Sequence, residues 1–454
     1  MEYNTEVINE MAQQLGTMLI DSITQHQKKG NTLTIADIEQ GMREALRQVG
    51  LQALGVCLEG LEETPAKAIP CDCGGVLQYQ RKREATVICV FGRLRYQRSY
   101  YAGCTCQKGK APLDARYGLE PGAVTAGLAQ LLALGGIEFS YDESPNWLEK
   151  FLLFEVAENT VRSETERMGQ LQDQEEKEWI EASQHEDQLE ERQRLLEAAP
   201  ACVYGSIDAA KVRIEPRPKR GEDKGEHVDW RDMKILCWYE VEEVRPAQQS
   251  ARQRAKNMHY FCDIQEAEEF GQLVWATGKT LKADLSADLI FLGDGAPWIW
   301  NLVSRYFPHA LQIVDWYHAE EHLEKCAKEL FPEGTRREAW LEGLKQALWE
   351  GQVEAVISAC QAFAKVSEQA RKDAAYFYTN AERMRYDCFR AAGYLIGSGT
   401  IESGCKQIVT HRLKLPGAQW TVEGAVNTAK ARAAWLSGQW QSLCDQRAAL
   451  PLAI

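Results

Sequence analysis

Three acidic residues are candidates for chemistry because of the patterns around them. Asp208 ends the apolar part of "GSIDAAKV", Asp294 follows the apolar run "ADLIFLG", and Glu402 begins a helical pattern after "IGSGT". Neighbouring strands lie about 4.8 Å apart, so two strand-end carboxylates and a third from a helix packed over them can share a small volume. Such a cluster repels itself unless cations neutralise it. The pattern therefore predicts two Mg²⁺ or Mn²⁺ ions and phosphodiester chemistry.

Each candidate also has a purely structural interpretation. An Asp between two glycines, like Asp294, is often a turn residue, and Glu402 is also suited to complement a helix dipole. Asp315 in "VDWYH" is the main rival of Asp294 as second carboxylate. It meets His318 only if the chain turns after Asp315, because an extended strand would point the two to opposite faces. We favour Asp294, since it ends the strand expected beside the first. His318 also has a structural interpretation, as a residue that forms a hydrogen bond within the fold.

The elements that must position these residues are predicted between 201 and 454. Three strand patterns from Ala201 are followed by alternating helix and strand, which is typical of a mixed α/β sheet with helices on its faces. Residues 319–395 show only helical spacing, and a glycine-rich turn then leads to the helix of Glu402.

The first 200 residues are predicted to form smaller pieces. Residues 1–65 are expected to be helical, with apolar residues at helical spacing: Ile8, Met11, Leu15, Met18 and Leu19. Residues 66–115 form a β module whose "ATVICVFGRLRYQRSYY" favours a hairpin, and residues 116–200 are helical again. Within the last segment, a turn-like "FEVAEN" separates two helical patterns. They suggest a helix-turn-helix with Asn159 as cap and Arg162 and Arg167 on the second helix, or simply two core helices.

Two cysteine pairs bracket the β module. Cys71 with Cys73 and Cys104 with Cys106 provide four thiolates at the ends of a hairpin, which fits a structural, zinc-ribbon-like Zn²⁺ site. Both pairs are C-x-C. The alternative is four reduced cysteines in a small β unit.

The net charge of -14 is unevenly distributed. Residues 171–198 hold ten acidic against three basic side chains and are expected to form a long surface or partner-facing helix. Basic residues gather in 215–225 and after Glu402. In the latter place Lys406, Arg412 and Lys414 are predicted to contact DNA phosphates, with a solvated helix face as the alternative.

Three long segments carry a family resemblance: "SIDAAKVRI", "LGDGAPWIWNLVSRYFPHALQIVDWYHAEEHL" and "YLIGSGTIESGCKQIVTHRLKLPGAQW". They closely resemble motifs of the DDE transposases of bacterial insertion sequences, specifically the Kra-type (ISKra) group, a relative of the Mutator-like superfamily. The resemblance spans most of residues 200–440. It implies a ribonuclease H-like catalytic domain, residues 201–318 and 396–454, interrupted by an all-helical insertion, residues 319–395.

The same resemblance implies roles for residues. Asp208, Asp294 and Glu402 would be the catalytic, metal-binding triad, while Asp315 and His318 match the family's Asp/Cys-x-x-His signature. The family usually shows C-x-x-C pairs where this chain has C-x-C.

The expected function is that of a DNA transposase, in which metal-activated water cuts at the ends of an insertion sequence and the freed 3' hydroxyl joins target DNA. The expected partners are terminal and target DNA and further copies of the chain, as a dimer or larger assembly. With no membrane-spanning pattern, we expect a bacterial cytoplasmic, nucleoid-associated protein. The alternatives are a domesticated, non-catalytic DNA-binding protein and a ribonuclease H-like nuclease without strand transfer.

Overall fold

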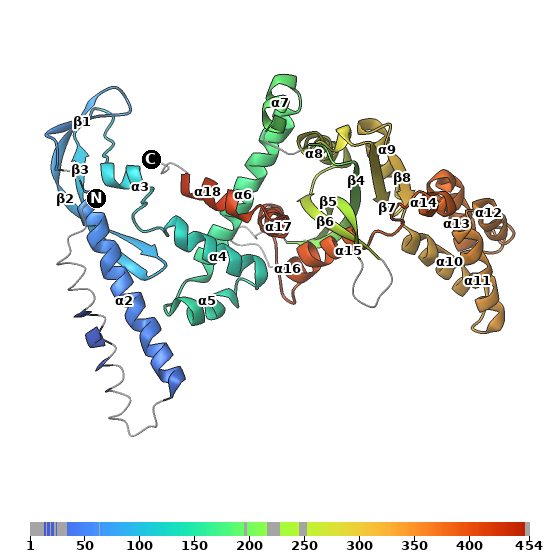
Figure 1. Cartoon of the computed structure of the whole chain (residues 1–454), viewed down its shortest axis with the longest axis horizontal. Coiled ribbons are helices and arrows are strands. Elements are labelled where there is room, and N and C mark those ends of the chain that lie inside the picture. The colour runs from blue at the N-terminus through green and yellow to red at the C-terminus, as the bar shows by residue number, and fades with distance from the viewer. Residues whose placement is uncertain are drawn as a thin grey trace. The chain divides into compact units, whose positions relative to one another are not determined.

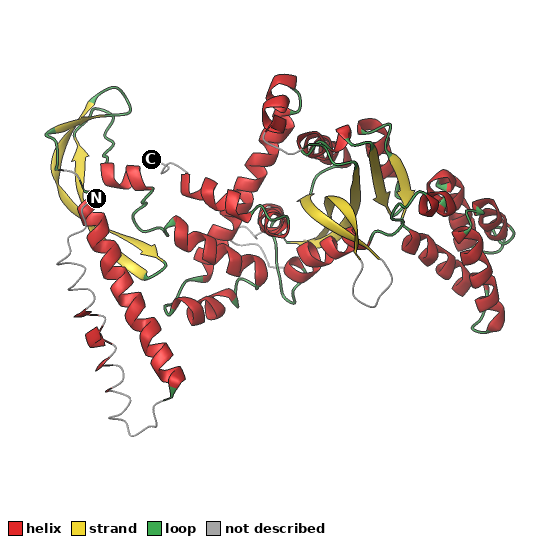
Figure 2. Cartoon of the chain, viewed as in Figure 1, coloured by secondary structure: helices red, strands yellow, loops and turns green. Residues whose placement is uncertain are grey.

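The computed structural model describes residues 34–62, 64–194, 198–215, 228–244 and 252–449, with a few residues between 13 and 24. The chain divides into two compact units, one formed by Met1–Met168 with Gln441–Ile454 and the other by Gly169–Trp440. The elements are labelled in Figure 1 and coloured by type in Figure 2. The cysteine pairs belong to the first unit and the candidate carboxylates to the second.

The first unit is built on a long helix and a twisted hairpin. Helix α2 (Ile35–Leu61) begins with a capping box, in which Thr34 and Asp37 each accept a hydrogen bond from the other's backbone N–H.

Two predicted features lie mostly outside the described residues. They are the basic segment 215–225 and the predicted N-terminal helix, of which Ile8, Met11, Leu15 and Leu19 are not described.

The predicted hairpin is confirmed. Strands β2 (Val76–Cys89) and β3 (Gly92–Ala102) pair antiparallel, and the short β1 (Ala68–Pro70) pairs with the start of β2. Alternate residues near the tip, such as Val87, Leu94 and Tyr96, form a core beneath α2, which leaves the intervening residues of β3, Arg93 and Arg95 among them, exposed. The other described helices of this unit are α3 (Pro112–Tyr117), α4 (Ala126–Glu138), α5 (Ser144–Leu152), the first part of α6 (Glu158–Ala182) and α18 (Trp440–Ala449).

The second unit contains a mixed five-stranded sheet with the order β6-β5-β4-β7-β8. Its strands are β4 (Cys202–Ile214), β5 (Asp229–Val244), β6 (Arg252–Asp263), β7 (Asp288–Gly293) and β8 (Leu311–Val314). The first three strands are antiparallel, whereas β7 runs parallel to both β4 and β8. The mixed α/β sheet is therefore as predicted, including the strand before Asp294 lying beside the first strand.

Helices pack on both faces of this sheet. On one face, the Trp238 indole of β5 donates to Thr277 Oγ1 of α8 (Ala267–Thr280) at 2.9 Å, and its ring meets that of Phe307, which follows α9 (Pro297–Tyr306). On the other face, the Tyr260 ring of β6 lies against Gly404 of α15 (Gly399–Cys405), and α17 (Val422–Leu436) packs on the same strand. The alternation of side chains along β4 and β5 places Asp208 on the face of α15.

Between β8 and α15 the described chain consists of helices and turns. They are α10 (Trp316–Leu330), α11 (Thr335–Trp349), α12 (Val353–Gln361), α13 (Glu368–Thr379), the 3₁₀ turn η2 (Ala381–Met384) and α14 (Tyr386–Ala391). Another 3₁₀ turn, η1 (Ala283–Leu285), precedes β7. After α15 the helical chain continues as a π-helical turn, η3 (Lys406–Thr410), and as α16 (His411–Leu413).

Two helical predictions need correction. Asn159 does not cap a helix, because α6 already begins at Glu158, and Arg162 forms an ion pair with Glu158 at 2.5 Å. The acidic stretch is also not one surface helix. It comprises the end of α6 and a separate α7 (Glu186–Arg194), and within α6 Glu176 and Trp179 are buried.

No helix in the described part of the chain combines the length and apolar composition that crossing a bilayer requires.

Candidate active site

The ends of three parallel strands bring three aspartates to one level of the sheet. Ser206 of β4 pairs with Leu292 of β7, and Leu292 pairs with Ile313 of β8. Asp208, Asp294 and Asp315 each follow these partners by two residues, so the register places their backbones side by side. The Asp315 N–H continues the ladder and donates to Gly293 O at 2.8 Å. The structure therefore brings the predicted rival Asp315 into the same row as Asp208 and Asp294.

Asp208 is a half-buried carboxylate whose burial is offset by few hydrogen bonds. Its Oδ1 accepts a hydrogen bond from Ala209 N at 2.7 Å, and its Oδ2 accepts a long one from the Cys405 thiol of α15 at 3.4 Å. Burial raises the pKa of Asp208 above its ordinary value and the charge of Asp294 raises it further, while these two hydrogen bonds and the charge of His318 oppose the rise. Folding therefore makes ionisation of Asp208 harder, and a cation bound beside it would offset this cost.

Asp294 stands in a loop of restricted conformation. Its Oδ1 accepts from Ala296 N at 2.8 Å, as in an Asx turn, and among the described residues no donor reaches its other carboxylate oxygen. Gly295 has φ of 95°, and a Cβ there would come within 2.5 Å of the Tyr376 ring. The Tyr376 hydroxyl also donates to Asp294 O at 2.9 Å. Helix α13, one of the helices between β8 and α15 (the helical block), thus fixes the loop that carries Asp294.

Asp315 is fully buried and its carboxylate is already engaged. It is the N-cap of α10, where Oδ1 accepts from Tyr317 N at 3.2 Å. Ser398, which precedes α15, donates its N–H to Oδ1 at 3.0 Å and its hydroxyl to Oδ2 at 2.8 Å. Asp315 therefore ties the start of α10 to the start of α15, the helix of Glu402.

Glu402 and His318 complete the site. Glu402 lies in the first turn of α15, as predicted, and the chain does turn directly after Asp315, so that His318 Nε2 comes within 3.9 Å of Asp315 Oδ2. Ligand atoms of Asp315, His318 and Glu402 all lie within 4.8 Å of one another. Cys405, one turn after Glu402 on the same side of α15, contacts Asp208. Glu402 therefore faces the aspartate row.

These environments distinguish Asp294 from Asp315. Both oxygens of Asp315 accept hydrogen bonds from Ser398 inside the protein, whereas Asp294 keeps one carboxylate oxygen without a donor among the described residues. An oxygen already used in this way has fewer lone pairs to offer a metal ion. Asp294 therefore has an oxygen to offer a metal ion and Asp315 positions α15, although ligand atoms of Asp315 also lie within 4.8 Å of those of His318 and Glu402.

The predicted basic residues after Glu402 do not form one surface. Lys406 and Lys414 are exposed, and Lys406 Nζ lies 3.9 Å from Glu402 Oε2. Arg412, by contrast, is 1% exposed and lies over the Trp420 ring at 5.0 Å. The prediction of Arg412 as a phosphate contact is corrected, because a buried guanidinium packed on an indole is not available to DNA.

A supporting network behind Asp294 was missed in the sequence. The His322 ring stacks on Tyr376 at 3.8 Å between centroids, and its Nδ1 lies 2.7 Å from the buried Asp373 carboxylate. Gln369 donates to both oxygens of Asp373 at 2.9 Å. Tyr376 lies 82 residues after Asp294, so no local spacing could have signalled this contact.

The four cysteines of the first unit converge, as predicted for a metal site. The Sγ–Sγ distances are 3.5 Å for Cys71–Cys106, 3.4 Å for Cys71–Cys73 and 3.3 Å for Cys73–Cys104. A tetrahedral Zn²⁺ site with Zn–S bonds of about 2.3 Å needs sulfur separations of about 3.8 Å, so the cluster is close to this geometry. A Cβ at Gly75 would come within 2.6 Å of Cys104 Sγ, which explains the glycine after the first pair.

One thiol in this cluster is poised to ionise. The Cys106 backbone N–H and the Cys73 thiol donate to Cys104 and lower its pKa to about 6. The cysteine cluster, and the group of Asp315, His318 and Glu402, each bring together ligand atoms that could hold a metal ion.

Residues 230–445 match an uncharacterised protein family, UPF0236. This range includes Asp294, Asp315, His318 and Glu402, but begins after Asp208 and the cysteines. No curated protein matches the chain.

Proposed function

We propose that this protein is a DDE-type transposase, which cuts DNA at the ends of an insertion sequence and joins the 3' end to target DNA. The carrying observation is the register that puts Asp208 and Asp294 at the ends of adjacent parallel strands, with Glu402 on the helix whose Cys405 contacts Asp208. The resemblance of three sequence segments to Kra-type transposases supports it. The strand order, with three antiparallel strands followed by two parallel ones, supports a ribonuclease H-like fold.

The residues at the site fit divalent cations. Among the described residues no lysine or arginine forms an ion pair with Asp208 or Asp294, and the charge of Asp294 contributes to the raised pKa of Asp208. Asp208, Asp294 and Glu402 would hold two Mg²⁺ or Mn²⁺ ions, as the family resemblance implies. Ions held there supply a lowered pKa for bound water and neutralise charge on the leaving oxygen.

The protein's own groups then have separate tasks. Asp208, Asp294 and Glu402 would hold the divalent ions that offset the negative charge of the reacting phosphate, and Asp315 holds the helix of Glu402 through Ser398. Tyr376 holds the Asp294 loop. Positioning of this kind carries most of the catalysis in phosphoryl transfer, where the attacking and leaving oxygens must be in line.

The test uses labelled DNA that contains the sequences flanking the gene on both sides, with Mg²⁺ and the full chain. We expect cleavage and strand joining by wild type, and loss of roughly 10³-fold or more in rate for Asp294→Asn, equivalent to about 4 kcal/mol. Asp187→Asn on the exposed α7 is the matched control and should act as wild type. Full activity of Asp294→Asn together with inactivity of Asp315→Asn would reverse the assignment of the second carboxylate.

The alternatives give different outcomes in the same assay. Cleavage without joining indicates a ribonuclease H-like nuclease. Specific binding without cleavage indicates a domesticated DNA-binding protein.

For the cysteine cluster we propose a structural Zn²⁺ site. Four thiolates leave no open coordination position, so the ion would stabilise the β module and take no part in catalysis. One equivalent of zinc should be measured by elemental analysis of the purified chain and should be absent from a Cys71→Ser, Cys106→Ser variant. A wild-type chain that binds no zinc would contradict the proposal.

A further inference from the structure

The β module has the opposite charge to the chain as a whole. Residues 67–116 hold ten lysine and arginine side chains against three acidic ones, in a chain of net charge -14. So strong a local excess in an acidic protein indicates a polyanionic partner or internal ion pairs. The contacts of the individual side chains decide between these.

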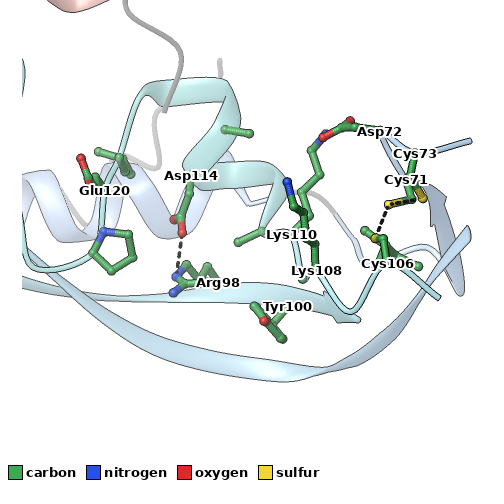
Figure 3. Close-up of a pocket in the computed structure, with 16 residues that line it drawn as sticks. Cys71, Asp72, Cys73, Arg98, Tyr100, Cys106, Lys108, Lys110, Asp114 and Glu120 are labelled. Atoms are coloured by element: carbon green, nitrogen blue, oxygen red, sulfur yellow. Dashed lines mark hydrogen bonds and ion pairs between the residues drawn. The ribbon is translucent and has the colours of Figure 1, made fainter. Parts of the chain in front are cut away.

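Some of these cations are used inside the unit. Arg98 is largely buried against Asp114, with Nε 2.9 Å from Oδ2, and a dashed line in Figure 3 marks this pair. Lys110 Nζ reaches Asp72 Oδ1 at 2.8 Å. The Arg83 guanidinium lies 3.7 Å from the centroid of the Tyr100 ring. Part of the excess positive charge is therefore used in contacts inside the unit.

Another set stands on the outer face of the hairpin. Lys82, Arg93 and Arg95 are exposed, and within the described residues none of them forms an ion pair or hydrogen bond. The register pairs Lys82 with Ser99 and Thr86 with Arg95, so side-chain alternation places all three on one face. The sole acidic residue on that face between Lys82 and Arg95 is Glu84. We name Lys82, Arg93 and Arg95 the outer cationic face.

The hairpin holds this face in a fixed geometry. Leu94 and Tyr96, on either side of Arg95, are 4% and 2% exposed and belong to the core beneath α2. At the tip, Arg47 of α2 donates to Phe91 O at 2.8 Å. With a rise of about 3.4 Å per residue, the face extends over about 20 Å from Arg93 to the level of Lys82. Cations fixed along such a line match a row of phosphates better than a single bound anion.

We propose that the outer cationic face binds the phosphate backbone of duplex DNA. It extends the proposed function, because it adds a contact surface distant in sequence from the carboxylates, and its contacts would position DNA without reading its sequence. The residue predicted for this task at Arg412 is buried, whereas these three side chains are exposed and free of partners in the described structure.

The test is a binding measurement without divalent metal, so that it does not depend on catalysis. A fluorescein-labelled duplex of about 30 base pairs and mixed sequence is titrated with the full chain over a series of salt concentrations. The triple variant Lys82→Gln, Arg93→Gln, Arg95→Gln should bind at least about tenfold more weakly at low salt. The slope of log affinity against log salt should fall by about 2 to 3, at about 0.9 for each lost phosphate contact.

The matched control removes the same charge elsewhere. Lys325→Gln, Lys328→Gln, Lys372→Gln alters three exposed lysines of the helical block, whose side chains are 59%, 66% and 61% exposed. It should keep the wild-type salt slope. An equal loss of affinity in both triple variants would overturn the proposal, since net charge alone would then explain binding.

Other results separate this inference from the proposed function. If Asp294→Asn loses cleavage but the outer-face variant alone loses binding, both stand. A wild-type salt slope in the outer-face variant overturns the surface while leaving the catalytic proposal intact. A change in the molar mass of the variant, measured by light scattering, with unchanged DNA affinity would assign the face to self-association and would also overturn it.

Discussion

Two groups of acidic side chains in the second unit differ in what balances their charge. Asp173, Glu176 and Asp263 surround Lys430, whose Nζ lies 2.8, 2.5 and 2.9 Å from their carboxylate oxygens. Asp208 and Asp294 have no such lysine or arginine among the described residues. A lysine of the protein balances the first group, whereas the proposed divalent ions would balance the second.

The pKa values of Lys430 and Asp173 follow this difference, whereas burial raises the pKa of Glu176 despite Lys430. Burial opposes ionisation of Lys430, but the charges of Glu176, Asp263 and Asp173 outweigh it and hold its pKa well above the ordinary value. Burial also opposes ionisation of Asp173, and the charges of Lys430 and Lys177 lower its pKa nonetheless. For Asp208 burial prevails, and its pKa is raised. An acidic cluster therefore indicates a metal site only when the protein supplies no cation of its own.

The largest effect is expected when the internal cation is removed. Lys430→Met leaves the buried Glu176 and Asp263 without a lysine or arginine partner among the described residues and Asp173 with the exposed Lys177, and should lower the free energy of unfolding by roughly 3 to 5 kcal/mol. The loss of stability should shrink as the pH falls. Without Lys430 the folded state raises the pKa of these carboxyls, so they become protonated and their buried charge no longer destabilises the fold. Urea unfolding measures both. Lys177→Met, which removes an exposed lysine paired with Asp173, is the control and should cost less than about 1 kcal/mol; a similar loss in both variants would remove the distinction.

Removing a carboxylate from the pair Asp208 and Asp294 should not lower the stability of the metal-free protein. Because the pKa of Asp208 is raised by folding, its ionised form costs stability at neutral pH, and Asp208→Asn should be as stable as wild type or more stable in EDTA. At Mg²⁺ concentrations about 100 times the dissociation constant, wild type should gain about 2.7 kcal/mol. The variant should lose most of that gain. Thermal unfolding with and without Mg²⁺ measures this, and equal stabilisation of both proteins by Mg²⁺ would contradict an ion at Asp208.

A smaller effect is expected from the support of Asp294. Tyr376→Phe removes the hydroxyl that donates to Asp294 O and should weaken Mg²⁺ binding by about 10 to 100 fold, as changes behind metal ligands do. Calorimetric titration measures it, with Tyr378→Phe as control, since Tyr378 is 73% exposed on the same helix. A variant that is less stable but binds Mg²⁺ normally would show that Tyr376 only packs.

The smallest effect concerns the thiol beside Asp208. Cys405→Ala removes a long hydrogen bond that lowers the pKa of Asp208, so this pKa should rise. Mg²⁺ binding should then require a higher pH and be about two to three times weaker on the acidic side of its pH profile, with little change at high pH. Equal weakening at all pH values would indicate a packing effect instead.

The sequence predicted the parts of this site that depend on local pattern. Alternation and turn residues located the strands before Asp208 and Asp294, and the glycine-rich turn located the helix of Glu402. It could not predict that Asp315 joins the row, because register between β7 and β8 depends on pairing across the sheet. Nor could it predict that Lys430 pairs with the other acidic group, since Lys430 lies more than 250 residues after Asp173 and Glu176. The burial of Arg412 depends in the same way on Trp420, which the helical spacing alone does not place over it.

The shared register of β4, β7 and β8 has a consequence for how the gene tolerates change. Conservative replacement of an apolar residue within β7 leaves the row of aspartates in place. Deletion of a single codon within β7 shifts Asp294 by one position against Asp208 and turns it to the opposite side of the sheet. The loop before β7 can lose a codon without moving either aspartate. Length variation among natural copies of this gene is therefore expected between the strands and not within them.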